Sequence, residues 1–168
     1  MGLDYLICMH SDGQADPKHL PLFFNCIDKF DDDFIFGSRL LKDSRVEDYS
    51  WLRRFVNLIF SYMQQLIIRQ RVYDIGCFVA YKIKTLEEIP YDRLVSDMGF
   101  PPYLILSARF FLKRKLRFHE FPIHWGKIEI SHVNPWIYGL VFLKRLARLA
   151  LWGPQLRVDS PELLTDQI

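Results

Sequence analysis

Three polar side chains alternate in a short loop near the start of the chain. His10, Asp12 and Gln14 follow the apolar run of residues 5–9, and alternate residues of an extended segment point to the same side. An imidazole, a carboxylate and an amide oxygen can bind Mn²⁺ or Mg²⁺ and leave positions open for diphosphate oxygens. An ordinary polar turn after a strand gives the same local pattern, and spacing alone favours the turn.

Arg39 has the chemistry of a phosphate site. It follows Gly37 and Ser38 at the end of a second apolar run. The planar guanidinium suits phosphate because it can donate two parallel charge-assisted hydrogen bonds. A surface arginine after a turn is the alternative for Arg39.

Two carboxylates stand beside later apolar runs. Asp74 precedes the run 78–81, where it either orients a substrate or caps a turn. Glu120 lies in the run 116–125, and we expect it to pair with a nearby Lys or Arg.

The apolar pattern predicts the elements that hold these residues. Short runs at 5–9, 33–36, 72–81 and 116–125 are typical of strands, and helical periodicity covers 17–29, 51–69, 101–115 and 135–152, with short helices at 85–89 and 93–95. Alternating strands and helices predict an α/β fold with a largely parallel sheet. The strand at 5–9 is apolar throughout, as in a strand buried between neighbours. The helix 51–69 carries one apolar stripe, as in an amphipathic helix: Leu52, Phe55, Val56, Ile59, Met63, Leu66 and Ile67.

Composition limits the class of protein. The chain has 168 residues, enough for one domain with its own core, and half of them are hydrophobic. Its net charge of +2 is too small to indicate a nucleic-acid partner. Three cysteines without a CxxC spacing, and no signal peptide, favour a cytoplasmic location. No run reaches the roughly 18 uncharged apolar residues of a spanning helix.

The last helix, 135–152, is amphipathic. Lys144, Arg145 and Arg148 fall within one arc among Leu, Phe, Ala and Trp. Such a helix can lie in a bilayer interface with its cations at anionic headgroups, which predicts a peripheral membrane location. A helix that covers the sheet, with its cations in water, is the equal alternative. We expect a domain at 1–134, this helix at 135–153 and a loose tail at 154–168.

The motifs together resemble those of family-2 glycosyltransferases with the GT-A fold, especially the dolichol- or polyprenyl-phosphate mannose synthases. Residues 10–17 resemble "DxDxQxxP", 33–39 resemble "D-[IV]-[IV]-x-G-S-R", 72–82 resemble "D-x-x-x-G-F-R-x-[YF]-[RK]", and 118–132 resemble "E-[VI]-P-[IV]" followed by "R-x-x-G-x-S". The departures are His10 for the first Asp, a disrupted Gly-Phe-Arg triplet, and no Gly after Lys127.

The resemblance implies a role for each residue. Asp12 and Gln14, with His10, would hold the metal, and the imidazole favours Mn²⁺ over Mg²⁺. Arg39 and Arg53, with Asn57, would hold the phosphate of an acceptor lipid, and Asp74 would begin the acceptor side of the catalytic site. Lys127, with Ser131, would reach the donor diphosphate.

The implied reaction is metal-assisted transfer of a sugar from a nucleotide-sugar donor to a polyprenyl or dolichyl phosphate. The resemblance covers about residues 4–152 and lacks the first half of the catalytic domain, so we expect this chain to be the C-terminal part of a GT-A domain that does not transfer sugar alone. A second chain could supply the missing N-terminal half. The alternative is an inactive remnant or a membrane-surface interaction protein that keeps the fold.

Overall fold

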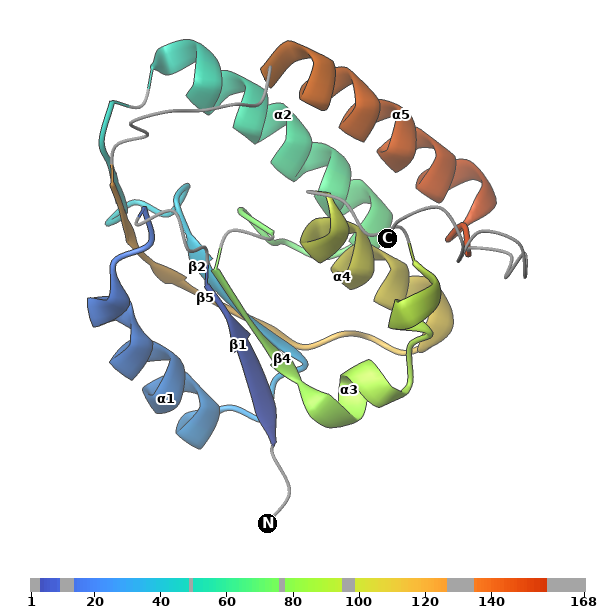
Figure 1. The fold of residues 1–168 in the computed structure, drawn as a ribbon, viewed down its shortest axis with the longest axis horizontal. Helices are drawn as coiled ribbons and strands as arrows, with labels where there is room; N and C mark the ends of the chain where they lie inside the picture. Colours follow the sequence, from blue (N-terminus) through green and yellow to red (C-terminus); the bar gives the residue numbers. More distant parts are fainter. Residues whose placement is uncertain are drawn as a thin grey trace, which may run out of the picture.

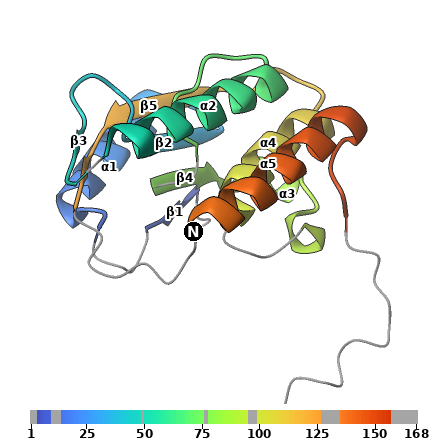
Figure 2. The same cartoon turned by 90° about the horizontal axis from the view of Figure 1, so that it is seen from above.

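A mixed four-stranded sheet forms the centre of the molecule. The computed structural model describes residues 4–9, 14–48, 50–75, 78–94, 99–126 and 135–156. Strands β1 (Tyr5–Cys8), β4 (Phe78–Lys82), β2 (Phe34–Ser38) and β5 (Phe118–Pro122) lie side by side in that order, which Figure 2 shows from above. The α/β class is confirmed. The sheet is mixed rather than largely parallel, because β4 runs antiparallel to both β1 and β2 and only β2 and β5 are parallel.

The first strand lies at the margin of this sheet. Within the described residues β1 pairs with β4 alone, and its residues alternate between half-buried and exposed, so that Leu6 is 48% exposed. The prediction that this strand is buried was therefore wrong. The continuous apolar run misled it, since alternate side chains of a marginal strand can be apolar and still face solvent.

Alternate residues of the central strands supply two cores on opposite faces of the sheet. Phe34, Phe36, Val79 and Tyr81 face a large core that includes residues of α2 (Trp51–Ile68), α4 (Phe100–Phe111) and α5 (Pro135–Trp152). Ile35, Phe78, Ala80 and Phe121 face a smaller core closed by α1 (Leu20–Lys29). Figure 1 shows α1 on one side of the sheet and α2 with α5 on the other.

The connecting elements are short. The 3-10 helix η1 (Pro17–His19) leads into α1, and α3 (Ile83–Glu87) with the 3-10 helix η2 (Tyr91–Arg93) follows β4. The predicted strand at 116–125 is two strands, β5 and β6 (His124–Trp125). The segment between β2 and α2 contains β3 (Arg45–Val46), which pairs in parallel with β6.

Helix α2 buries only part of its predicted apolar stripe. Met63 and Ile67 of the stripe pack against the large core with Phe60, and the fully buried positions of the helix are Ser61, Gln64 and Ile68. Four other residues of the stripe are exposed: Leu52, Phe55, Ile59 and Leu66. The predicted stripe is therefore divided between the core and the solvent.

Helix α5 has the predicted bounds and packs beside α2. Phe142, Leu146 and Leu149 are buried in the large core, and the rings of Phe60 and Phe142 lie 5.5 Å apart. Arg145 lies over the ring of Tyr103, while Lys144 and Arg148 are exposed. In the part of the chain that is described, no helix has the length and apolar character needed to cross a bilayer.

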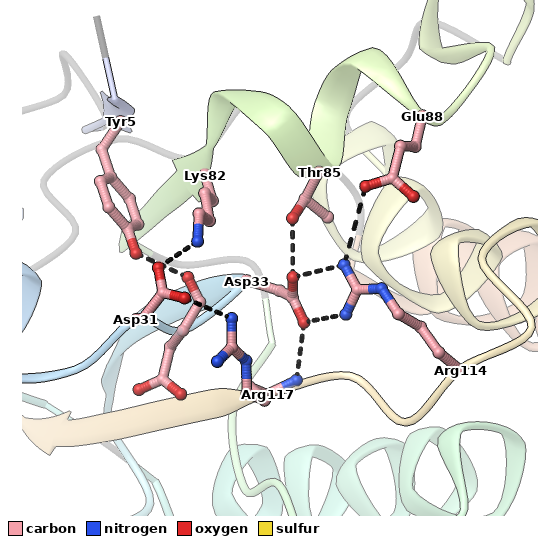
Figure 3. A network of polar contacts seen from close by, with 9 residues as sticks. Tyr5, Asp31, Asp33, Lys82, Thr85, Glu88, Arg114 and Arg117 are labelled. Carbon is pink, nitrogen blue, oxygen red and sulfur yellow. Dashed lines mark hydrogen bonds and ion pairs between the residues drawn. The ribbon is translucent and has the colours of Figure 1, made fainter.

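A buried carboxylate holds the sheet together at the start of β2. Asp33 is fully buried and accepts two hydrogen bonds from the guanidinium of Arg114, one from Thr85 Oγ1 and one from the backbone of Arg117 (Figure 3). Burial pushes the pKa of Asp33 upward, but these hydrogen bonds outweigh it and hold the pKa below its usual value.

Next to this network, the exposed Asp31 pairs with Lys82 and Arg117 (Figure 3). The two cations lower the pKa of Asp31 to about 2. Tyr5 donates from its hydroxyl to the carbonyl of Asp32, so the start of β1 is joined to the same loop. This network lies at the opposite end of β2 from Arg39.

Candidate functional site

The candidate site lies where β2 ends. Gly37 and Ser38 are the last residues of β2, and Arg39 is the first residue beyond the strand. A Cβ atom on Gly37 would lie 2.6 Å from Cγ2 of Ile123, so only glycine fits between β2 and the segment that follows β5. This close approach brings the chain after β2 next to the chain after β5.

Arg39 and Asp74, both predicted site residues, lie in direct contact. Asp74 Oδ2 accepts hydrogen bonds from the backbone nitrogen and the Nε of Arg39, each at 2.8 Å, and Oδ1 accepts from Nη2 at 3.0 Å. The Asp74 side chain is 7% exposed and the Arg39 side chain 22%. Because one carboxylate holds both the backbone and the guanidinium, Arg39 has a fixed direction at the edge of the site.

Glu120 of β5 in turn holds Asp74. Its two carboxylate oxygens accept hydrogen bonds from the backbone nitrogens of Tyr73 and Asp74, at 2.9 to 3.0 Å. Among the described residues, the partners of Glu120 are thus backbone amides rather than the expected Lys or Arg. Burial raises the pKa of Glu120, against the opposing effect of these two backbone hydrogen bonds.

Trp125 links Arg39 to the loop after β1. The guanidinium carbon of Arg39 lies 5.4 Å from the centre of the Trp125 ring, a cation–π distance. The backbone nitrogen of Gly126 donates to the carbonyl of Gln14 at 2.8 Å, and Ala15 bridges to Trp125. The described end of the predicted metal loop therefore lies beside the strand that contacts Arg39.

The other predicted acceptor residues start helix α2. Ser50 caps this helix by accepting a hydrogen bond from the backbone nitrogen of Arg53. The Arg53 side chain is exposed, and Asn57 is half-buried one turn later. The structure thus places both on the predicted helix, and their role toward a phosphate stays a prediction.

Four predicted site residues lie outside the described residues: His10, Asp12, Lys127 and Ser131. Of the predicted metal ligands only Gln14 is described, and the described ranges contain no group of three His, Cys, Asp or Glu side chains that could hold a metal. The assignment of the metal ligands and of the residues that bind the donor diphosphate therefore stays a prediction. It depends on the residue types in these loops alone.

The geometry assigns chemistry to the described part of the site. A guanidinium fixed by a carboxylate on one side and an indole ring on another is a pre-oriented binder of phosphate. Since the oxygens of Asp74 accept three N–H groups of Arg39, the geometry favours an orienting role for Asp74. Its contact with a reacting group stays a prediction.

Two residues of this arrangement were missed as site residues. Glu120 and Trp125 were noted within a motif, but no role was given to Trp125. The available signal was a single carboxylate inside an apolar strand, because a buried carboxylate requires donors. Which donors it finds depends on Tyr73 and Asp74, 47 and 46 residues earlier, and no local pattern shows that.

A comparison with protein families identifies the family of this chain. Residues 2–90 match the family model described as "Glycosyl transferase family 2", which covers more than half of the 168 residues. The matched region includes the loop before α1, β2 with Arg39, helix α2 and Asp74. Glu120 and Trp125 lie beyond it and reach the site through the fold.

Proposed function

This chain belongs to glycosyl transferase family 2, and from that premise we propose that it serves transfer of a sugar from a nucleotide-sugar donor to a polyprenyl or dolichyl phosphate. Family membership supports glycosyl transfer in general. The lipid-phosphate acceptor, as in the mannose synthases that the motifs resemble, is the part that we add.

The observation that supports a phosphate acceptor is the fixed direction of Arg39. Asp74 and Trp125 hold the guanidinium at the end of β2, next to the loop that contains Gln14. An arginine oriented in advance loses little freedom when it binds a phosphate, which increases its contribution to affinity. Arg53 at the start of α2 would make the second contact with the same phosphate.

Metal dependence is a further part of the proposal. The donor set of His10, Asp12 and Gln14 fits Mn²⁺ better than Mg²⁺ because it includes an imidazole. A bound divalent cation would neutralise the departing nucleoside diphosphate, with Lys127 and Ser131 as its partners from this chain. Titration calorimetry with a sugar nucleotide should show tighter binding in Mn²⁺ than in Mg²⁺. Equal affinities, or an Asp12→Ala variant that binds like the wild type, would contradict this assignment.

The acceptor is tested by binding of a short soluble lipid phosphate. We expect the chain to bind farnesyl phosphate more tightly than farnesol, which has the same tail without the phosphate. Arg53→Ala should weaken farnesyl phosphate binding about ten- to hundredfold, the range for one charge-assisted contact, and leave farnesol binding unchanged. Arg54→Ala is the matched control, because Arg54 is also exposed in the first turn of α2.

Two results would contradict the acceptor assignment. One is equal binding of farnesol and farnesyl phosphate. The other is loss of sugar-nucleotide affinity in Arg53→Ala with farnesyl phosphate affinity intact, because the arginine would then belong to the donor side.

A peripheral membrane location belongs to the same proposal, since the acceptor resides in a bilayer. Helix α5 buries Phe142, Leu146 and Leu149 in the core and exposes Lys144 and Arg148. These cations would lie at anionic headgroups. Binding to anionic vesicles should therefore weaken with rising salt and in Lys144→Glu/Arg148→Glu, whereas salt-independent binding would contradict it.

A further inference from the structure

Helix α2 exposes several of its large apolar side chains and buries two polar ones beside Ile68. Trp51, Phe55, Tyr62 and Leu66 have exposed fractions between 55% and 78%, while Ser61 and Gln64 are buried. Buried Ser61 donates to the carbonyl of Val72, and Gln65 donates to Ser61. The orientation of the helix is thus fixed by specific polar contacts on its inner side, and its outer side is apolar.

The exposed side chains form one continuous stripe. Trp51, Phe55, Tyr62 and Leu66 are four, seven and four residues apart, so they project within about 60° of one another on a helix of 3.6 residues per turn. Leu58 and Ile59, also exposed, fall on the two sides of this line. The stripe is about 22 Å long, because Trp51 and Leu66 are separated by fifteen steps of 1.5 Å along the helix.

The charged residues of α2 and α5 have one sign. The 18 residues of α2 and the 18 residues of α5 contain no Asp or Glu. Arg53 and Arg54 are exposed on α2, and Lys144 and Arg148 on α5, which packs beside it. Both helices also expose apolar residues, since Leu140, Leu151 and Trp152 of α5 are 69% to 73% exposed.

We infer that the outer face of α2, defined by Trp51, Phe55, Leu58, Ile59, Tyr62 and Leu66, docks on an anionic lipid surface. A long apolar stripe with aromatic residues, cations and no acids lies in the plane of a bilayer interface. A second copy of this chain fits less well, because α2 contains arginines and no acidic residue, so no ion pair between the two helices would support the contact. The inference rests on the proposed lipid-phosphate acceptor, because it brings the first turn of α2, which contains Arg53, to the lipid surface. It assigns the main apolar contact with the membrane to α2 rather than to α5.

Flotation with vesicles tests the docking face without any sugar donor. The probes are vesicles of phosphatidylcholine alone and of phosphatidylcholine with phosphatidylglycerol. We expect the chain to float with the anionic vesicles, and Phe55→Ser to lower the partition coefficient about tenfold. The matched control is Phe24→Ser in α1, because Phe24 is also 55% exposed but lies on the other side of the sheet. Equal losses in the two variants, or none in Phe55→Ser, would overturn the inference.

The fluorescence of Trp51 gives a second readout. Brominated lipids should quench the wild-type chain more than Trp51→Phe, because Trp51 is removed from the interface in that variant. Sedimentation of the wild type and of Phe55→Ser without lipid tests whether a second copy of the chain covers this face instead. A wild-type dimer that Phe55→Ser abolishes would overturn the lipid assignment. Docking by the α2 face with no preference for farnesyl phosphate over farnesol would refute the proposed acceptor alone. Preference for farnesyl phosphate over farnesol, without docking by the α2 face, would refute the docking face alone.

Discussion

The carboxylate of Asp74 accepts hydrogen bonds from the backbone and the side chain of Arg39, although 35 residues separate the two. Such a double contact fixes the turn after β2 and the direction of the guanidinium together. Glu120 adds a third residue, because it accepts from the backbone nitrogens of Tyr73 and Asp74. The direction of Arg39 therefore depends on the end of β2, the segment before β4 and the middle of β5.

Removal of the charge on Asp74 should weaken phosphate binding. Asp74→Asn keeps the size of the side chain but has only one oxygen for the three N–H groups of Arg39, so the guanidinium loses its orientation. We expect farnesyl phosphate affinity to fall about tenfold, as for loss of one charge-assisted contact, with a lower melting temperature. Calorimetry and thermal unfolding measure the two effects. Asp28→Asn, an exposed change on α1, should alter neither, and an unchanged affinity in Asp74→Asn would exclude the orienting role.

Glu120→Gln tests whether Glu120 of β5 helps to orient Arg39 by holding the backbone of Tyr73 and Asp74. The amide has one acceptor oxygen and two N–H donors, which would face the N–H donors of Tyr73 and Asp74. We expect the free energy of unfolding to fall by about 1–3 kcal/mol, the cost of leaving a buried polar group unsatisfied. Farnesyl phosphate affinity should fall as well, although Glu120 itself does not contact Arg39. Urea unfolding and calorimetry on the same samples distinguish this from a purely structural role, in which only stability would change.

The sequence predicted the bounds of the helices and strands better than it predicted which of them pack together. Helix α5 has the predicted bounds, and β2 ends at the predicted Gly-Ser-Arg, because capping and turn residues are local signals. The position of β1 at the margin and the exposed stripe of α2 could not be predicted in this way. Periodicity shows that apolar residues share one side of a helix, but which side faces the core depends on distant partners such as Val72, which accepts from Ser61. Likewise, the motifs identified Arg39 and Asp74 separately, and only the fold shows that they are in contact.

Acid should destabilise the protein through Asp33. The pKa of Asp33 is lower in the folded chain than in the unfolded one, so its stabilising contribution is present above the unfolded pKa of about 4 and is lost as the pH falls below it. Asp33→Asn should lower the free energy of unfolding by about 2–3 kcal/mol at neutral pH and flatten its dependence on pH in the acid range. Urea unfolding between pH 3 and 7 measures both. The control is Asp31→Asn, whose side chain is 68% exposed and should matter much less, since solvent screens its two ion pairs.

A methyl group at position 37 should loosen the site from the sheet. In Gly37→Ala the new Cβ would lie 2.6 Å from Cγ2 of Ile123, so β2 and the chain after β5 must separate. Overpacking of this kind costs about 1–3 kcal/mol. Gly139→Ala is the matched control, because its Cβ would meet only Cζ of Phe60, at 3.6 Å, and alanine favours a helix by about 0.5–1 kcal/mol. Addition of Ile123→Ala to Gly37→Ala should recover part of the lost melting temperature, and no recovery would show that the clash is elsewhere.

The strand order β1-β4-β2-β5 has a consequence for how the chain reaches its native state. Even the nearest paired residues of this sheet, Gly37 and Phe78, are far apart along the chain, and Phe34 pairs with Phe118. No two neighbouring strands of this sheet are joined by a hairpin, so every pairing must close a long loop first. Folding should therefore be slow for a chain of this length. During synthesis β1 and β2 emerge long before β4 is available to join them, and their apolar edges remain open to chaperones until it does.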